Sequence, residues 1–188
     1  GHHRPPRRVR FKSIFLQATS ACGITTRDKI ACWGPKEFKI KSLAGRPRDF
    51  GKYPPPKGKF KMLEGDKKSG SKYCGLTMKG QVHCRGHKLK ELGALWPDAT
   101  MIDLSVGGYG TDVCGIDTQR KIRCREKDIY NKEFYENIPE GRFLKISLGS
   151  SHGCALRDDE QVICWDNKGK KWSYTQDELD AIPYGKRL

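Results

Sequence analysis

The stretch that decides the fold runs from Phe143 to Trp165 and reads FLKISLGSSHGCALRDDEQVICW. It contains an apolar segment, then Cys-Ala-Leu, then five mostly polar residues, then Val-Ile-Cys-Trp. The same pattern, C-[GA]-[IL]-x5-[IV]-x-C, occurs four times and uses all eight cysteines. The first cysteines of the four units are 52, 40 and 40 residues apart. A regular period of this size is typical of repeat proteins.

Each unit predicts a β-hairpin that is crosslinked by a disulfide. The midpoint of each cysteine pair falls in a polar turn, so its two cysteines are equally far from the turn and lie opposite each other on neighbouring strands. Directly opposed Cβ atoms lie about 4.5–5.5 Å apart, which a disulfide bridges after slight adjustment. The spacing fits neither a zinc knuckle nor a C-x-x-C redox motif. The expected pairs are Cys22–Cys32, Cys74–Cys84, Cys114–Cys124 and Cys154–Cys164.

Four disulfides would also compensate for the low hydrophobic content of the chain. Hydrophobic residues make up 36% of the chain and charged residues 31%, so the core is thin. Each eleven-residue crosslinked loop is worth roughly 3 kcal/mol on the chain-entropy model. Disulfide crosslinks belong to secreted proteins, so we expect a secreted, extracellular protein. The alternative is a cytosolic repeat protein with reduced structural cysteines. The sequence contains no apolar run near the roughly 18 residues of a spanning helix, and no secretory h-region.

The positive charge is concentrated in the N-terminal part of the chain. Of the formal net charge of +15, residues 1–72 carry +14, from 19 Lys or Arg and 5 Asp or Glu. Such asymmetry favours a polyanionic partner, namely nucleic acid, a sulfated glycan or anionic lipid. A basic arm that only keeps the chain soluble is the alternative. The residues expected to contact a polyanion are Arg7, Arg8, Arg10, Lys57, Lys59, Lys61, Lys67 and Lys68.

The domain organisation follows from composition. Residues 1–10 hold four Arg, two Pro and no acid, which predicts a flexible basic arm. Residues 11–188 are expected to form a single domain of four repeats, with a long basic loop at 34–59. Ile182-Pro183 repeats the Ile138-Pro139 that leads into the last unit. We therefore expect the C-terminal segment to lie beside the N-terminal strand and to close a ring, because a ring removes exposed sheet edges.

The last unit resembles the regulator-of-chromosome-condensation repeat. The resemblance rests on Ile146-Ser147-Leu148-Gly149, His152, Cys154-Ala155-Leu156 and Val162-Ile163-Cys164-Trp165. It covers about residues 11–34 and 60–172 and is strongest in the last unit. A weaker similarity to tectonin-type lectin repeats comes from Val113-Cys114-Gly115-Ile116. The resemblance implies an all-β chain that forms a small β-propeller, of the type whose secreted members carry paired cysteines. Four units are fewer than the usual seven blades, so either four blades close a small ring or two chains combine.

The sequence predicts no enzyme, no cofactor and no metal site. It lacks a glycine-rich phosphate loop and a G-x-S-x-G motif. The acidic cluster Asp158-Asp159-Glu160 falls in a hairpin turn, and a zinc site from His83 and His87 is a weak alternative.

The function that we expect is a secreted binding module, of the effector, inhibitor or receptor-ligand type, that recognises an extracellular or host protein through propeller loops. Its expected contacts are aromatic residues in loops, Tyr53, Tyr109 and Trp172. Glycan or nucleic-acid binding is the first alternative, and an intracellular chromatin or small-GTPase factor the second. The oligomeric state is left open between a monomer and paired half-rings.

Overall fold

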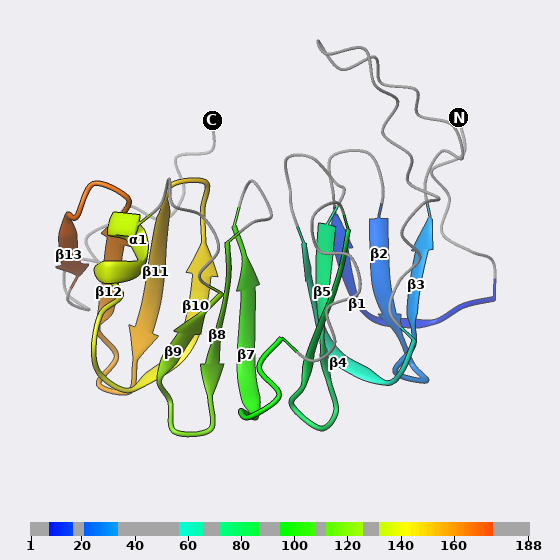
Figure 1. The fold of residues 1–188 in the computed structure, drawn as a ribbon. Coiled ribbons are helices and arrows are strands. Elements are labelled where there is room, and N and C mark those ends of the chain that lie inside the picture. Colours follow the sequence, from blue (N-terminus) through cyan, green and yellow to red (C-terminus); the bar gives the residue numbers. More distant parts are fainter. Residues whose placement is uncertain are drawn as a thin grey trace, which may run out of the picture.

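The computed structural model describes residues 8–16, 21–33, 57–65, 72–86, 95–107, 112–125 and 132–174, which fold into four antiparallel sheets. Each of the first three sheets has three strands, and the fourth has four (Figure 1). Sheet 1 contains β1 (Phe11–Leu16), β2 (Ala21–Thr25) and β3 (Ile30–Trp33). Sheet 2 contains β4 (Phe60–Gly65), β5 (Lys72–Thr77) and β6 (Val82–Gly86). Sheet 3 contains β7 (Met101–Val106), β8 (Val113–Asp117) and β9 (Ile122–Cys124). Sheet 4 contains β10 (Phe143–Leu148), β11 (His152–Arg157), β12 (Val162–Asp166) and β13 (Lys171–Tyr174). One short helix, α1 (Lys132–Glu136), lies between sheets 3 and 4 in the sequence.

The register confirms the predicted disulfide hairpins. In each unit the two cysteines are directly opposed across the central hairpin, with Cα atoms 4.0 Å apart, and no cysteine of the chain is free. Each pair shares one face of its sheet with aliphatic residues, such as Leu76 and Val82 beside Cys74 and Cys84. We call this side of each sheet its disulfide face.

The opposite side of each sheet carries the small residue of the C-[GA]-[IL] motif, and we call it the glycine face. We call the first strand of each sheet (β1, β4, β7 or β10) its inner strand. In sheets 1 to 3 the first residue of the inner strand packs over this small residue. A Cβ atom on Gly75 would lie 2.5 Å from Phe60 Cδ1, and one on Gly115 would lie 2.7 Å from Met101 Cε. Only glycine or a residue nearly as small leaves room for that approach, which explains the restriction of the second motif position.

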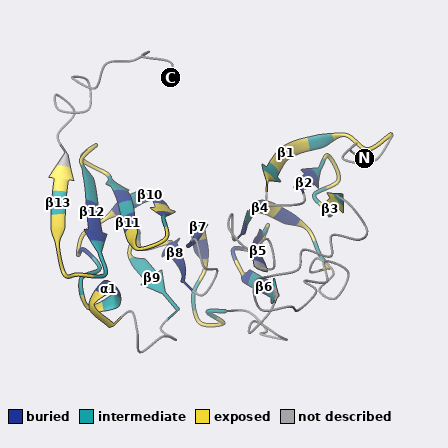
Figure 2. Cartoon of the chain, turned by 90° about the horizontal axis from the view of Figure 1, so that it is seen from above, coloured by how far each residue is buried: buried dark blue, intermediate teal, exposed yellow. Residues whose placement is uncertain are grey.

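The core forms where the disulfide face of one sheet meets the glycine face of the next. Leu76 and Val82 of sheet 2 pack against Leu104 and Val106 of sheet 3. Ile116 and Cys114 of sheet 3 pack in the same way against Ile146, Leu148 and Trp165 of sheet 4. Seen from above, the four sheets follow one another along an arc, with sheets 1 and 4 at its two ends (Figure 2). The prediction of four disulfide-crosslinked propeller units is therefore confirmed.

Backbone and side-chain hydrogen bonds join successive sheets. Three turn carbonyls accept from the first N–H of the next inner strand: Asp28 from Phe60, Gly80 from Met101, and Arg120 from Phe143, each at 2.8 Å. Between sheets 3 and 4, the Asp103 carboxylate accepts from the Ile146 N–H and the Ser105 hydroxyl from the Leu148 N–H, both at 2.9 Å. These bonds fix the angle at which one sheet meets the next.

Two predictions about the ends of the chain fall outside the described residues. The closure of the ring by residues 182–186 beside the N-terminal strand stays a prediction. So does the division into an arm at 1–10 and a domain at 11–188, of which the structure describes residues 8–10 and the parts given above.

The third residue of the turn has a left-handed backbone in all four hairpins, and in the first three its carbonyl joins two sheets. The φ angles are 62° at Asp28, 79° at Gly80, 65° at Arg120 and 69° at Glu160. Glycine adopts this conformation without penalty, whereas other L residues pay about 1–2 kcal/mol. We expect Glu160→Gly to raise the free energy of unfolding by about 0.5–1 kcal/mol, measured by urea denaturation. Gln161→Gly, one residue further on, is the control and should lower it.

Candidate binding face

The hairpin turns and the starts of the inner strands lie at the same end of all four sheets, which we call the turn face. The turns comprise residues 26–29, 78–81, 118–121 and 158–161. Each is tied to the residue before the inner strand of its own sheet, for example through the Thr26 N–H to the Arg10 carbonyl at 2.9 Å and the Met78 N–H to the Lys59 carbonyl at 3.2 Å. Residues distant in sequence therefore form one continuous surface, at the bottom of Figure 1.

Sheets 1 and 2 make their half of the turn face strongly basic. Nine Lys or Arg residues lie there, all exposed, and the only acid among the described residues of this half is Asp28. We call the nine the basic cluster: Arg8, Arg10, Lys12, Arg27, Lys29, Lys57, Lys59, Lys61 and Lys79. The one ion pair that the described residues form within it joins Lys12 Nζ to Asp28 Oδ1 at 2.6 Å.

The pKa of the Asp28 carboxyl is lowered by cations of this cluster. The hydrogen bond from Lys12 lowers the pKa of the Asp28 carboxyl, slight burial opposes the shift, and the positive charges of Lys12 and Lys59 add to the lowering. Asp28 therefore stays ionised at neutral pH and compensates one of nine positive charges. The remaining charge is uncompensated by described residues and attracts anions.

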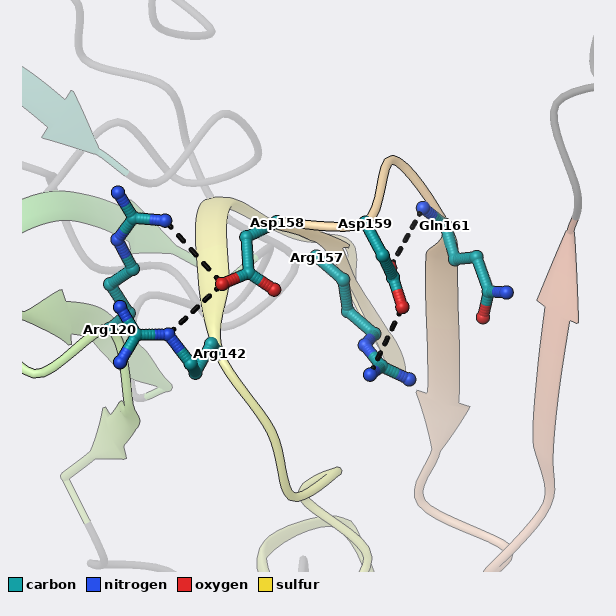
Figure 3. A network of polar contacts seen from close by, with 6 residues as sticks. All are labelled: Arg120, Arg142, Arg157, Asp158, Asp159 and Gln161. Carbon is teal, nitrogen blue, oxygen red and sulfur yellow. Dashed lines mark hydrogen bonds and ion pairs between the residues drawn. The ribbon is translucent and has the colours of Figure 1, made fainter.

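Sheets 3 and 4 give the other half of the turn face a different character, because it carries acids as well as bases and most of them form ion pairs. Asp158 lies between two guanidinium groups, 3.0 Å from Arg142 Nε and 3.5 Å from Arg120 Nη1 (Figure 3). Arg157 is 3.1 Å from Asp159. The turn face is thus segregated into a basic half, in which one of nine cations is paired with an acid, and a half in which acids and bases are mixed and mostly paired.

Asp117 organises the turn of sheet 3 beside this paired region. It accepts hydrogen bonds from Arg123 Nε at 2.9 Å and from the backbone N–H groups of Gln119 and Lys121 at 2.9 and 3.0 Å. Burial raises the pKa of the Asp117 carboxyl, but these three hydrogen bonds together outweigh it, so that the pKa lies below its ordinary value.

This lowered pKa predicts a pH dependence of stability. The folded-state pKa of Asp117 is below the unfolded value of about 3.9, so its contribution is complete above that pH and is lost as the pH falls through the folded value. We expect Asp117→Asn to lower the free energy of unfolding by about 1–2 kcal/mol at pH 7, and by less at pH 3. Urea titrations at both pH values would measure this. Asp159→Asn, at an exposed carboxylate, should change stability little; equal losses at both pH values would contradict the assignment.

The structure brings together five of the eight predicted polyanion contacts. Arg8, Arg10, Lys57, Lys59 and Lys61 all belong to the basic cluster. Arg7, Lys67 and Lys68 lie outside the described residues. Gly65 and Lys72, which flank residues 66–71, lie at the end of sheet 2 opposite the turn face.

Four members of the basic cluster were missed by the sequence reasoning. Arg27, Lys29 and Lys79 belong to hairpin turns, and Lys12 is the second residue of β1. Their signal was present, since the midpoints of the first two cysteine pairs are Arg27 and Lys79. What the sequence did not show is that the hairpin turns lie beside the residues that precede each inner strand.

The predicted aromatic contacts have a different outcome. Tyr53 and Tyr109 lie outside the described residues. Trp172 lies in β13 and not in a loop; it is half-buried on the disulfide face of sheet 4, opposite Cys164. A binding role for these three residues stays a prediction.

The described residues show no group of three or more His, Cys, Asp or Glu side chains placed to hold a metal ion. His83 is half-buried in β6, and His87 lies outside the described residues. The His152 ring packs over Gly149, and the small cavity that it borders with Asp112 and Asn167 has room for about one water molecule.

No helix of the described residues is long and apolar enough to cross a membrane.

Residues 143–165, which are β10 to β12 with their connecting turns, match the model of the regulator of chromosome condensation (RCC1) repeat. Sheet 4 is therefore similar to an RCC1 repeat over its first three strands. The register shows that the other three sheets have the same inner strand, hairpin and disulfide as sheet 4. No curated protein has a detectably similar sequence.

Solved structures with the same fold are β-propellers. The ectodomain of the Arabidopsis thaliana receptor kinase ACR4 is 18% identical, with a TM-score of 0.58 over 86% of this chain and 52% of that one. The entire ectodomain of the Physcomitrella patens receptor kinase CR4 is 17% identical, with a TM-score of 0.61. The match covers 98% of this chain and 47% of that one. Yeast RCC1 (Prp20), solved with Kap60 bound, is 10% identical, with a TM-score of 0.55 over 87% and 45%. The chain therefore has the propeller fold and spans about half the length of these structures.

Proposed function

We propose that the protein is a secreted, non-catalytic binding module that recognises an acidic surface of an extracellular protein through the basic cluster. The observation that carries this proposal is the charge segregation of the turn face: nine exposed cations with one acid on sheets 1 and 2, and paired charges on sheets 3 and 4. A protein partner of matching charge pattern is steered and oriented by such a face. The four disulfides support an oxidising compartment.

The propeller structures with the same fold support a binding role of this kind. Two are ectodomains of receptor kinases, and one was solved with a bound protein. Propellers present turns and loops on a rigid frame, which suits recognition. Here the turns are additionally locked to the neighbouring sheets by backbone hydrogen bonds, so the cations of the basic cluster sit on an ordered surface.

Charge reversal within the basic cluster tests this function. We expect the triple variant Arg27→Glu, Lys29→Glu and Lys59→Glu to bind its protein partner at least about tenfold more weakly, or about 1.4 kcal/mol. The measurement is affinity capture from extracellular fluid, followed by titration of the captured protein. The matched control is Lys168→Glu, Lys170→Glu and Lys171→Glu, which reverses three exposed charges at β12 and β13. Equal loss in both variants would contradict the assignment to the basic cluster.

A second candidate function uses the same residues. The number of unpaired cations also favours a polyanion, either a sulfated glycan or nucleic acid. Heparin and duplex DNA are the probes, titrated between 50 and 500 mM salt. A steep linear fall of log affinity with log salt, lost in the triple variant, would favour this function over recognition of a protein, whose interface responds less to salt.

A further inference from the structure

Among the described residues, no sheet covers the outer face of the arc at either end, and the two outer faces are of opposite kind. Every internal junction joins the disulfide face of one sheet to the glycine face of the next. At the N-terminal end, the glycine face of sheet 1 has no described sheet before it. At the C-terminal end, the disulfide face of sheet 4 has none after it. One outer face is thus a glycine face and the other a disulfide face, and these are the two kinds of face that pack together in every junction inside the chain.

The glycine face of sheet 1 keeps the apolar residues of a junction. Ile14 and Leu16 occupy the register positions that Ile146 and Leu148 occupy in sheet 4. Ile146 and Leu148 are each 7% exposed, whereas Ile14 and Leu16 are each 66% exposed. Exposed residues colour much of β1 yellow in Figure 2, where β7 and β8 are largely buried. Two large aliphatic side chains on one strand face indicate a surface that is covered in the working protein.

The disulfide face of sheet 4 has the matching features. Leu156 and Val162 occupy the positions of Leu76 and Val82 in sheet 2, which are buried to 0 and 1% exposure, but they are only half-buried. Trp172 lies on the same face, opposite Cys164. An amphipathic aromatic residue beside aliphatic neighbours is characteristic of binding hot spots.

Two of the polar groups that join sheets inside the chain recur at the two open ends, whereas Lys145 occupies the position of Asp103. Glu160 has the position and positive φ of Arg120, whose carbonyl accepts from the Phe143 N–H; Phe11 has the position of Phe143. Ser147 has the position of Ser105, whose hydroxyl accepts from the Leu148 N–H, and it is exposed. Sheet 4 thus offers two acceptors, and sheet 1 two donors, of a further junction.

We propose that two copies of the chain join head to tail, the glycine face of sheet 1 of each copy packing on the disulfide face of sheet 4 of the other, into a closed ring of eight sheets. In each junction the Phe11 N–H donates to the Glu160 carbonyl of the second copy, and the Leu16 N–H donates to the Ser147 hydroxyl. A head-to-tail contact closes with two copies when each spans half a circle. This chain covers 47% and 52% of the lengths of two propeller ectodomains.

The area of the two junctions is sufficient for association. A three-stranded face with strands of six residues measures about 14 by 20 Å, or about 280 Å². The ring forms two junctions at once and covers four such faces, about 1,100 Å² in total. This lies just above the roughly 1,000 Å² that a specific interface needs. We therefore expect a dimer that dissociates on dilution.

Light scattering during size-exclusion chromatography, at loading concentrations from about 1 to about 200 µM, tests the ring. We expect a mass approaching twice 21.4 kDa at the highest concentration. Leu16→Asp should weaken dimerisation at least about 100-fold, because it places a charge inside each junction. Ser147→Lys should weaken it from the other face. Met78→Asp is the matched control, since Met78 is 54% exposed on a hairpin turn away from both faces, and it should leave the dimer intact.

Hydrogen exchange supplies the second measurement. In the wild type, the amides of residues 11–16 and 154–164 should exchange more slowly at 200 µM than at 1 µM. In Leu16→Asp, they should exchange at the same rate at both concentrations. A chain that stays monomeric at 200 µM overturns the proposal, as does a dimer that Leu16→Asp leaves unchanged. If residues 11–16 are protected in a monomer and lose protection when residues 175–188 are deleted, the C-terminal segment covers sheet 1 and the two-copy ring is wrong.

Discussion

Trp165→Ala is expected to lower the free energy of unfolding by about 3–5 kcal/mol, the largest effect of any single substitution that the structure predicts. Trp165 is 0% exposed and lies in the junction between sheets 3 and 4. Its ring lies over Gly153, where an added Cβ would be 2.6 Å from Trp165 Cζ2, and 5.5 Å from the ring of Phe134 of α1. Alanine would leave a cavity between sheets 3 and 4, and the backbones of the two sheets cannot move together to fill it.

Urea denaturation followed by circular dichroism measures this loss, and Trp172→Ala is the matched control. Trp172 is half-buried in β13 on the opposite face of the same sheet, with no described sheet beyond it. We expect about 1 kcal/mol for Trp172, since only part of its surface leaves water on folding. A loss below about 1.5 kcal/mol for Trp165→Ala would mean that sheets 3 and 4 are not packed through this side chain.

The fold could be predicted because its determinants are local. The distance between Cys154 and Cys164, with a polar turn at its midpoint, fixes the hairpin, and the hairpin fixes the disulfide. The small residue between Cys and Leu or Ile could be recognised as a motif. The reason why this position requires a small residue could not be predicted, because it depends on a contact between strands, such as that of Phe60 with Gly75.

The candidate site could be predicted only in part, because it is made by the packing of sheets. Arg10 and Lys59 were recognisable as members of a basic region, but Arg27 and Lys79 looked like ordinary turn residues. The bond from the Phe60 N–H to the Asp28 carbonyl, together with the packing of Ile24 on Phe60, places the turn of sheet 1 beside the start of β4. The pairing of Asp158 with Arg120, 38 residues earlier, depends on the same geometry.

The disulfides give the second large prediction. The four bridges together are worth about 11 kcal/mol on the chain-entropy model, which is comparable to the whole stability of a domain. We expect complete reduction to unfold the protein at 37 °C, seen as loss of the sheet signal in circular dichroism. Intact mass should rise by about eight hydrogens on reduction, with no alkylation beforehand, since no cysteine is free. Eight alkylated thiols in the untreated protein would instead favour the intracellular alternative.

The order in which the bridges open follows from their burial. Cys74 and Cys84 are 0 and 1% exposed because sheet 3 covers them, whereas Cys32 at the outer strand of sheet 1 is exposed. A reductant must reach a sulfur atom directly, so access controls the rate of thiol–disulfide exchange. Under limiting reductant we expect Cys22–Cys32 to be alkylated first and Cys74–Cys84 last, as peptide mapping would show. The reverse order would mean that the disulfide face of sheet 2 is not held against sheet 3, and the stacking of sheets would then be wrong at its centre.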